Sequence, residues 1–229
     1  AYLTLQSQVK TFAIFMRNWH EDSGACTVEE DLALAVSITN LLQIELHVVD
    51  FAAEYKSEVF QEFLDDYAAG LTPNPDILCN KNIKFKHLML AAQSLGASKL
   101  VTGHYARSVQ KSGRHYIQEG LDANKDQSYF LSALSSAQIS AAEFPLGGMT
   151  KPAVRQLAEK IGLPNFAKKD STGICFIEPD NFNEFLQNYI LTRPGEIRDE
   201  TGRILGQHSG LPFYTIGQRS GLNIGGRSD

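Results

Sequence analysis

The amino-acid sequence predicts an α/β fold built around a doubly wound parallel sheet, with a small second module. Short continuous apolar runs are typical of buried parallel strands, and they occur at residues 11–16, 44–49 and 99–103. Apolar residues at helical spacing fill the intervals, at about residues 28–42, 54–69 and 80–95. Strands that alternate with helices favour a parallel sheet, whose ligands bind beyond the carboxyl ends of the strands.

Local signals support the remaining elements. The second helix carries one apolar stripe, and Gly70 is suited to its C-terminal cap. The members of that stripe are Tyr55, Val59, Phe63 and Tyr67. A hairpin is predicted over residues 108–118, with its turn at Lys111-Ser112-Gly113, and a further helix over about residues 150–162.

The character of the sequence changes near residue 181. One amphipathic helix is followed there by a Gly-rich stretch with short β-like pieces around Ile197, Ile204 and Phe213. We therefore assign residues 1–178 to the α/β domain and residues 179–229 to a small second module.

The composition is that of an ordinary globular protein. The 229 residues are 43% hydrophobic and 21% charged, and no apolar run approaches the roughly 18 residues of a membrane helix. A signal-peptide pattern is also missing, so no membrane association is expected. Three cysteines argue against a disulfide scaffold and predict a cytoplasmic protein.

Charge is unevenly distributed along the chain. Residues 1–70 carry twelve acidic and three basic side chains, whereas residues 71–229 carry fourteen acidic and eighteen basic ones. The basic excess after residue 70 is compatible with a polyanion-binding face and equally with an ordinary solvated surface.

Cys79 closes an unusual loop with the sequence Thr72-Pro73-Asn74-Pro75-Asp76-Ile77-Leu78-Cys79. The two prolines predict a rigid extended turn rather than a helix. Cys79 is then expected at the start of the next helix, where unpaired N–H groups, the helix dipole, Lys81 and Lys84 would stabilise a thiolate. Asp76 is a candidate acid or base, or alternatively a helix cap.

Cys175 lies in the segment Asp170-Ser171-Thr172-Gly173-Ile174-Cys175-Phe176. Gly173 permits a sharp turn, and the apolar neighbours would keep water from a labile persulfide, but the same context fits a cysteine packed in a strand. Cys26 has no recognisable partner and is interpreted as inert. The cysteine and histidine spacings predict no zinc site.

Three further segments are candidates for ligand contacts. The loop after Met16 and the Gly103-His104 turn each follow a predicted strand. His104 is interpreted either as a nucleotide-site residue or as a structural histidine. Lys125-Asp126-Gln127 fits an ordinary polar loop and equally a loop that contacts phosphates or bases.

In combination, these motifs resemble those of one family, the tRNA-specific 2-thiouridylases, over nearly the whole chain. The matching motifs stand in the same order and are Phe15-Met16-Arg17-Asn18-Trp19, Thr72 to Asn80, Thr102-Gly103-His104-Tyr105, Asn124 to Leu131, Ser171 to Ile177, and Thr215-Ile216-Gly217-Gln218-Arg219. Several multi-residue motifs in order are far more specific than any one of them.

The resemblance implies a fold like that of the adenine nucleotide alpha hydrolases and an enzyme that replaces O2 of the tRNA wobble uridine with sulfur. ATP, with Mg²⁺, would adenylate that oxygen, and a cysteine persulfide would deliver the sulfur. The implied partners are tRNA and a sulfur-relay protein or cysteine desulfurase. The protein is expected to be a cytoplasmic monomer.

The same resemblance assigns roles to individual residues. Cys175 matches the persulfide-bearing cysteine and Cys79 the second catalytic cysteine, so a Cys79–Cys175 disulfide is an expected product. The remaining matches are Asn74, Pro75 and Asp76 at the target base, with Asp76 as acid or base, Met16 and Gly103 at the adenine nucleotide, and His104, Lys125, Asp126 and Gln127 at the tRNA.

One signature of that family is absent. A Ser-Gly-Gly-x-Asp-Ser phosphate loop, whose backbone N–H groups would hold pyrophosphate, does not occur in the 229 residues. The resemblance places this loop before Ala1 and a C-terminal β-barrel after Asp229. The chain is therefore interpreted as an internal piece that is inactive by itself.

Two rival interpretations stay open. Another ligase of the same ATP-pyrophosphatase fold, acting on a small molecule, would need the nucleotide site but not two reactive cysteines. A tRNA-binding module or thiol–disulfide redox protein would act without consuming ATP.

Overall fold

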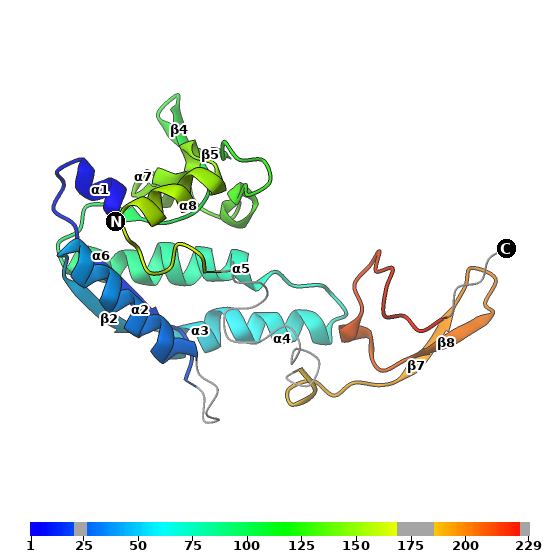
Figure 1. Ribbon diagram of the computed structural model, residues 1–229. Helices are drawn as coiled ribbons and strands as arrows, with labels where there is room; N and C mark the ends of the chain where they lie inside the picture. Colours follow the sequence, from blue (N-terminus) through cyan, green and yellow to red (C-terminus); the bar gives the residue numbers. More distant parts are fainter. Residues whose placement is uncertain (21–26, 169–185, 225–229) are drawn as a thin grey trace. The chain divides into compact units, whose positions relative to one another are not determined.

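The computed structural model describes residues 1–20, 27–168 and 186–224 (Figure 1). The chain divides into two compact units. The first comprises residues 1–59 and 76–170, and the second comprises residues 60–75 and 171–229.

Parallel strand pairs are the framework of the first unit. Strand β1 (Ala13–Arg17) pairs with β2 (Leu46–Asp50), and helix α2 (Thr27–Leu42) connects them. Strand β3 (Leu100–Val101) pairs with β6 (Ala142–Glu143). The predicted α/β class with parallel strands is confirmed. In the described part of the chain the strands form two separate parallel pairs rather than one continuous sheet.

Helical segments supply most of the remaining structure. They are α1 (Tyr2–Gln6), α3 (Ala52–Tyr55), η1 (Lys56–Phe60), α4 (Gln61–Ala68), α5 (Pro75–Leu78), η2 (Cys79–Leu88), α6 (Met89–Ser94), η3 (Ser128–Leu131), α7 (Ser136–Ser140), η4 (Pro145–Gly148) and α8 (Lys151–Lys160). Segments η1 and η2 have the wider turn of a π-helix, whereas η3 and η4 are 3₁₀ turns.

The helical stretch predicted over residues 54–69 is confirmed as α3, η1 and α4. Three of the four residues of the predicted stripe, Tyr55, Val59 and Phe63, are buried. Gly70 has a φ of +78° just beyond the helix, a left-handed conformation that glycine adopts without strain.

The helix predicted to begin near Asn80 begins at Pro75 instead, and α5, η2 and α6 run consecutively to Ser94 (Figure 1). Proline fits the first helical position because its φ is already helical and its missing N–H has no partner there. Pro75 therefore starts the helix and does not extend the turn, so the expectation of a turn reaching Cys79 was wrong.

A β-hairpin follows strand β3 in the chain. Strands β4 (Ala106–Lys111) and β5 (Arg114–Glu119) pair antiparallel, as the sequence predicts. Both turn residues, Ser112 and Gly113, have positive φ angles of 48° and 75°, which suits the twist of a two-residue hairpin turn. The hairpin lies very close to η4. A Cβ on Gly147 of η4 would stand only 1.8 Å from the carbonyl oxygen of Ala106 in β4.

The core of the first unit packs around η2. The largest fully buried side chains there are Tyr55, Val59, Cys79, Asn80, Ile83, Phe85 and Leu131. Each aliphatic or aromatic side chain of this size stabilises the fold by about 1.5–3 kcal/mol when it is removed from water. This cluster fixes the helix that carries the predicted site residues.

The second unit has its own aromatic contacts and a short antiparallel ribbon. Phe63 and Tyr67 of α4 meet edge to face with centroids 4.8 Å apart. Strand β7 (Gly195–Arg198) pairs with β8 (Ile204–His208), so the β-like pieces at Ile197 and Ile204 are confirmed. Phe213 lies instead in a 3₁₀ turn, η6 (Leu211–Phe213).

Within the described residues, no helix is both long and apolar enough to cross a membrane.

Candidate active site

Asp76 occupies the first turn of α5, directly after Pro75. A carboxylate is favourable at this position because the helix N-terminus carries a partial positive charge. Burial nevertheless raises the pKa of Asp76 above its ordinary value, and the nearby Lys84 only partly offsets this effect. Asp76 therefore combines two properties of a proton-transferring group, a raised pKa and a position at the edge of the core.

Cys79 lies one turn further into the same helix and is only 1% exposed. The unpaired N–H groups of a helix belong to its first four residues, and here these are the residues from Pro75 to Leu78. The expectation that Cys79 sits at a helix start is therefore wrong, and the unpaired N–H groups of the helix end do not reach its sulfur. Any reaction of its sulfur requires a partner that reaches into the core.

His104 follows strand β3, and its side chain packs among aromatic rings. Its Nδ1 lies 2.8 Å from the hydroxyl of Thr102, and its ring centroid lies 6.0 Å from that of Phe85 and 6.2 Å from that of Phe144. Burial, together with the charge of Lys84, lowers the pKa of His104 to about 4. The imidazole is thus neutral near pH 7, a state in which it offers one donor and one acceptor.

Lys84 is the group that links these two residues. Its charge lowers the pKa of both Asp76 and His104, so the ammonium lies near both. The sequence suggested Lys84 only as a positive charge near Cys79. A stronger signal was present, because Asp76, Asn80 and Lys84 recur every four residues and so share one side of a helix.

The loop over residues 122–128 lies next to this group and is held by its own polar side chains. The backbone N–H of Tyr105 donates to Oε1 of Gln127 at 3.0 Å, and the Gln127 N–H donates to the Tyr105 carbonyl at 3.0 Å. The carboxylate of Asp126 accepts from the Gly120 N–H at 2.7 Å and from the Ser128 hydroxyl at 2.6 Å. These bonds of Gln127 and Asp126 fix the loop beside Tyr105, which follows His104 in the chain.

These bonds also set the charge of Asp126. Burial raises the pKa of this carboxyl, but the hydrogen bonds from Ser128 and Gly120 outweigh it and hold the pKa below its ordinary value. Lys125, by contrast, is exposed, which suits contact with a phosphate.

Asn80 joins the helix to the segment that follows the loop. Its Nδ2 donates to the carbonyl of Phe130 at 3.1 Å, and the side chain is almost fully buried. This bond spans fifty positions of the sequence, so neither spacing nor composition predicts it.

Met16 and Gly103 lie where the sequence predicts, at the carboxyl ends of β1 and β3. Two buried polar atoms beyond Met16, Nε of Arg17 and Oδ1 of Asn18, have no hydrogen-bond partner in the described part of the chain. Buried polar atoms without partners are costly, and a polar ligand at this strand end would satisfy them.

The structure brings together only part of the predicted set. Asp76, His104 and the loop over residues 125–127 lie in the first unit around η2, while Asn74 and Pro75 precede Asp76 directly in the chain. Cys175 and Cys26 lie outside the described residues.

The parallel strands, their connecting helices and a polar site at one helix define an α/β domain of the HUP type. Residues 1–179 match the family model described as "tRNA methyl transferase HUP domain", and residues 183–229 match the "tRNA methyl transferase PRC-barrel domain". The chain belongs to this tRNA methyl transferase HUP family.

Curated relatives are identical to the chain at about half of the aligned positions. A protein named tRNA-specific 2-thiouridylase MnmA is 52% identical over 93% of the chain in Xanthomonas campestris, and proteins of the same name are 54% identical over 99% in Verminephrobacter eiseniae and 51% identical over 99% in Pseudomonas aeruginosa. The chain spans 57%, 62% and 61% of these relatives' own lengths.

Proposed function

We propose that the whole protein replaces O2 of the wobble uridine of tRNA with sulfur in an ATP-dependent reaction. The observation that carries this proposal is the clustering of Asp76, Lys84 and His104 around the helix that holds Cys79. Relatives that are about half identical over nearly the whole chain bear the name 2-thiouridylase, which favours sulfur transfer over the methylation named in the family model's description.

Each group in the cluster has a task that its surroundings suit. Asp76, with its raised pKa, holds or transfers a proton at the target base, next to Asn74 and Pro75. Lys84 stabilises negative charge that develops on the departing oxygen. His104 stays neutral and offers hydrogen bonds to a flipped-out nucleotide without adding a buried charge.

The nucleotide would occupy the strand ends at Met16 and Gly103. The two unpaired buried atoms of Arg17 and Asn18 fit a polar ligand there. ATP, when bound, supplies the activation that turns the uridine oxygen into a leaving group. Among the described residues no group of three or more metal-ligating side chains lies together, so Mg²⁺ would arrive on the phosphates of ATP.

The two cysteines complete the proposed chemistry. The terminal sulfur of a persulfide on Cys175 attacks C2 of the uridine, and the activated oxygen leaves. The thiolate of Cys79 then attacks the sulfur of Cys175, which breaks the S–S bond, leaves the outer sulfur on C2 and forms a Cys79–Cys175 disulfide. An external dithiol reduces this disulfide, and a sulfur-relay protein or cysteine desulfurase reloads Cys175.

The arrangement of the whole protein follows from the same proposal. Residues 1–178 form the catalytic domain and residues 179–229 a small module that assists tRNA binding. Lys125, Asp126 and Gln127 position the tRNA, with Lys125 on a phosphate. The protein works as a monomer in the cytoplasm, where its tRNA substrate is.

The decisive experiment detects the product. The whole protein is incubated with tRNA, ATP, Mg²⁺ and a sulfur donor, and digested nucleosides are separated by mass spectrometry. We expect 2-thiouridine that depends on ATP, and we expect Cys79→Ser and Cys175→Ser to abolish it while Cys26→Ser retains it. Methylated uridine formed from S-adenosylmethionine, or full activity of Cys175→Ser, would overturn the proposal.

A further inference from the structure

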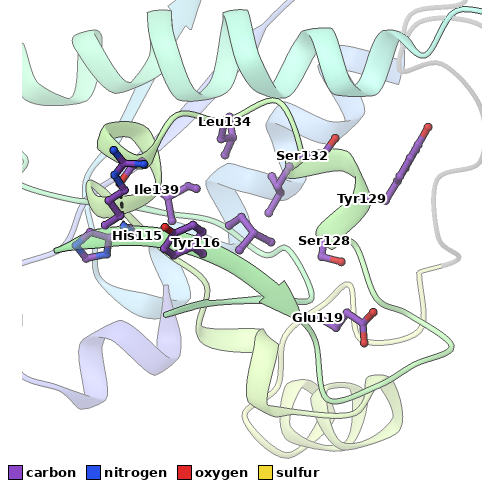
Figure 2. A pocket seen from close by; sticks show the side chains of 12 residues that line it. His115, Tyr116, Glu119, Ser128, Tyr129, Ser132, Leu134 and Ile139 are labelled. Atoms are coloured by element: carbon purple, nitrogen blue, oxygen red, sulfur yellow. Dashed lines mark hydrogen bonds between the residues drawn. The ribbon is translucent and has the colours of Figure 1, made fainter. Parts of the chain in front are cut away.

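A pocket of about 560 Å³ lies between strand β5 and the segment from η3 to α7 (Figure 2). Buried apolar side chains, those of Leu131 and Ile139, form part of its lining. The hydroxyl-bearing residues Ser128, Ser132 and Ser136 line it as well. An apolar interior with a few polar groups is typical of sites for small ligands, and this volume is in their usual range.

Two exposed aromatic rings flank the pocket. Tyr129 is 62% exposed and Tyr116 is 46% exposed, although both line the same hollow. Figure 2 shows them toward opposite ends of the row of lining side chains. Exposed tyrosines of this kind are stacking platforms for bases, because every base has a flat face that can pack on a ring.

The hairpin beside the pocket is basic in a chain that is acidic overall. The chain has a formal net charge of −5, yet residues 104–118 contain three basic side chains, Arg107, Lys111 and Arg114, and no acidic one. Arg114 lines the pocket itself, and Glu119 is the single acidic residue of the lining. This charge suits a polyanionic partner, and the exposed rings beside it suit one that carries bases.

The pocket continues directly from the loop that the proposed function places on tRNA. Ser128, which lines the pocket, follows Gln127 and donates its hydroxyl to Asp126 at 2.6 Å. Ser128 thus joins the pocket lining to the loop that is proposed to contact tRNA.

We propose that this pocket binds unpaired nucleotides of the tRNA other than the target uridine. Their bases stack on Tyr129 and Tyr116 over the apolar lining, and Arg114 contacts a phosphate. This inference rests on the proposed function, because it assumes that tRNA is the substrate. It adds a second contact, separate from the Asp76–His104 cluster.

The test measures binding of fluorescently labelled tRNA to the whole protein at several salt concentrations. Loss of one base–ring stack by Tyr116→Ala should weaken binding roughly 5- to 100-fold, and Tyr116→Phe should bind almost like the wild type. Arg114→Gln should weaken binding and reduce the slope of log affinity against log salt by about one. Lys160→Gln, the same charge change on α8 outside the pocket, should have little effect.

The outcomes separate the two proposals. Tyr129→Ala tests the second ring on a different element, and a thermal melt of each variant shows whether it is folded. The inference is overturned if the folded variants Tyr116→Ala, Tyr129→Ala and Arg114→Gln all bind tRNA like the wild type. This holds even if the variants accept less sulfur from a protein sulfur donor. A wild-type protein that makes no 2-thiouridine refutes the proposed function instead.

Discussion

The Asp76–His104 cluster and the β4–β5 hairpin differ in how their polar groups meet water. In the cluster, burial raises the pKa of Asp76 and lowers that of His104, so the surroundings decide the protonation states. On the hairpin, Arg107, Lys111 and Arg114 are exposed on short strands. Catalysis requires groups whose protonation state the protein sets, whereas binding of a polyanion requires charges that are exposed to solvent. The contrast predicts where substitutions should affect catalysis and where they should affect binding alone.

The largest expected effect is that of Asp76→Asn on turnover. Loss of the proton-transferring carboxyl should lower the rate of thiolation about 10²- to 10⁴-fold and leave the affinity for tRNA nearly unchanged. Single-turnover formation of 2-thiouridine and tRNA binding by the whole protein measure the two quantities. A variant that loses affinity and keeps its rate would place Asp76 with the binding groups.

Asp76→Asn should also stabilise the protein at neutral pH. Since burial raises the pKa of Asp76 in the folded state, its contribution to stability falls as the pH rises from the ordinary value of 3.8 through the folded value. Asparagine carries no charge and avoids this loss. Denaturant unfolding at pH 7 measures the difference, and equal stabilities of the two proteins would show that Asp76 is well solvated.

The third prediction concerns the stability of the protein in acid and His104. The pKa of His104 falls to about 4 in the folded state, so the unfolded chain binds the proton more strongly and stability drops as the pH falls from about 6.5 to about 4. His104→Gln should remove up to about 3 kcal/mol of this acid sensitivity. Denaturant unfolding at successive pH values tests it, with parallel curves expected above pH 7. Equal slopes below pH 6.5 would contradict the buried position of the ring.

Local patterns predicted the elements of this fold, and tertiary contacts decided the site. The apolar stripe of Tyr55 and Val59 identifies a helix, and the Ser112-Gly113 pair identifies a hairpin turn, because both depend on near neighbours alone. Pro75 was ambiguous, since proline fits a turn and a helix start equally well. Because the helix begins at Pro75, Cys79 lies inside the helix and in the core rather than at the helix start.

Partners across the fold could not be predicted in this way. Asn80 bonds to a carbonyl fifty positions away, and the effect of Lys84 on His104 depends on the packing of the His104 ring against Phe85 of η2. The roles of Gln127 and Asp126 as loop-holding groups likewise follow from their bonds to Tyr105 and Gly120.

The smallest expected effect compares two asparagines on the same helical segment. Asn80 donates to the carbonyl of Phe130 at 3.1 Å, and Asn82 donates to the carbonyl of Glu58 at 3.1 Å. Each alanine variant should lose about 1–2 kcal/mol of unfolding free energy, since each removes one side-chain donor from a backbone carbonyl. Asn80→Ala should in addition weaken tRNA binding a few-fold, because Phe130 adjoins Tyr129 at the pocket, whereas Asn82→Ala should not. Equal tRNA affinities of the two variants would mean that the helix does not influence tRNA binding at the pocket. The Asp76–His104 cluster and the hairpin would then bind the tRNA independently of each other.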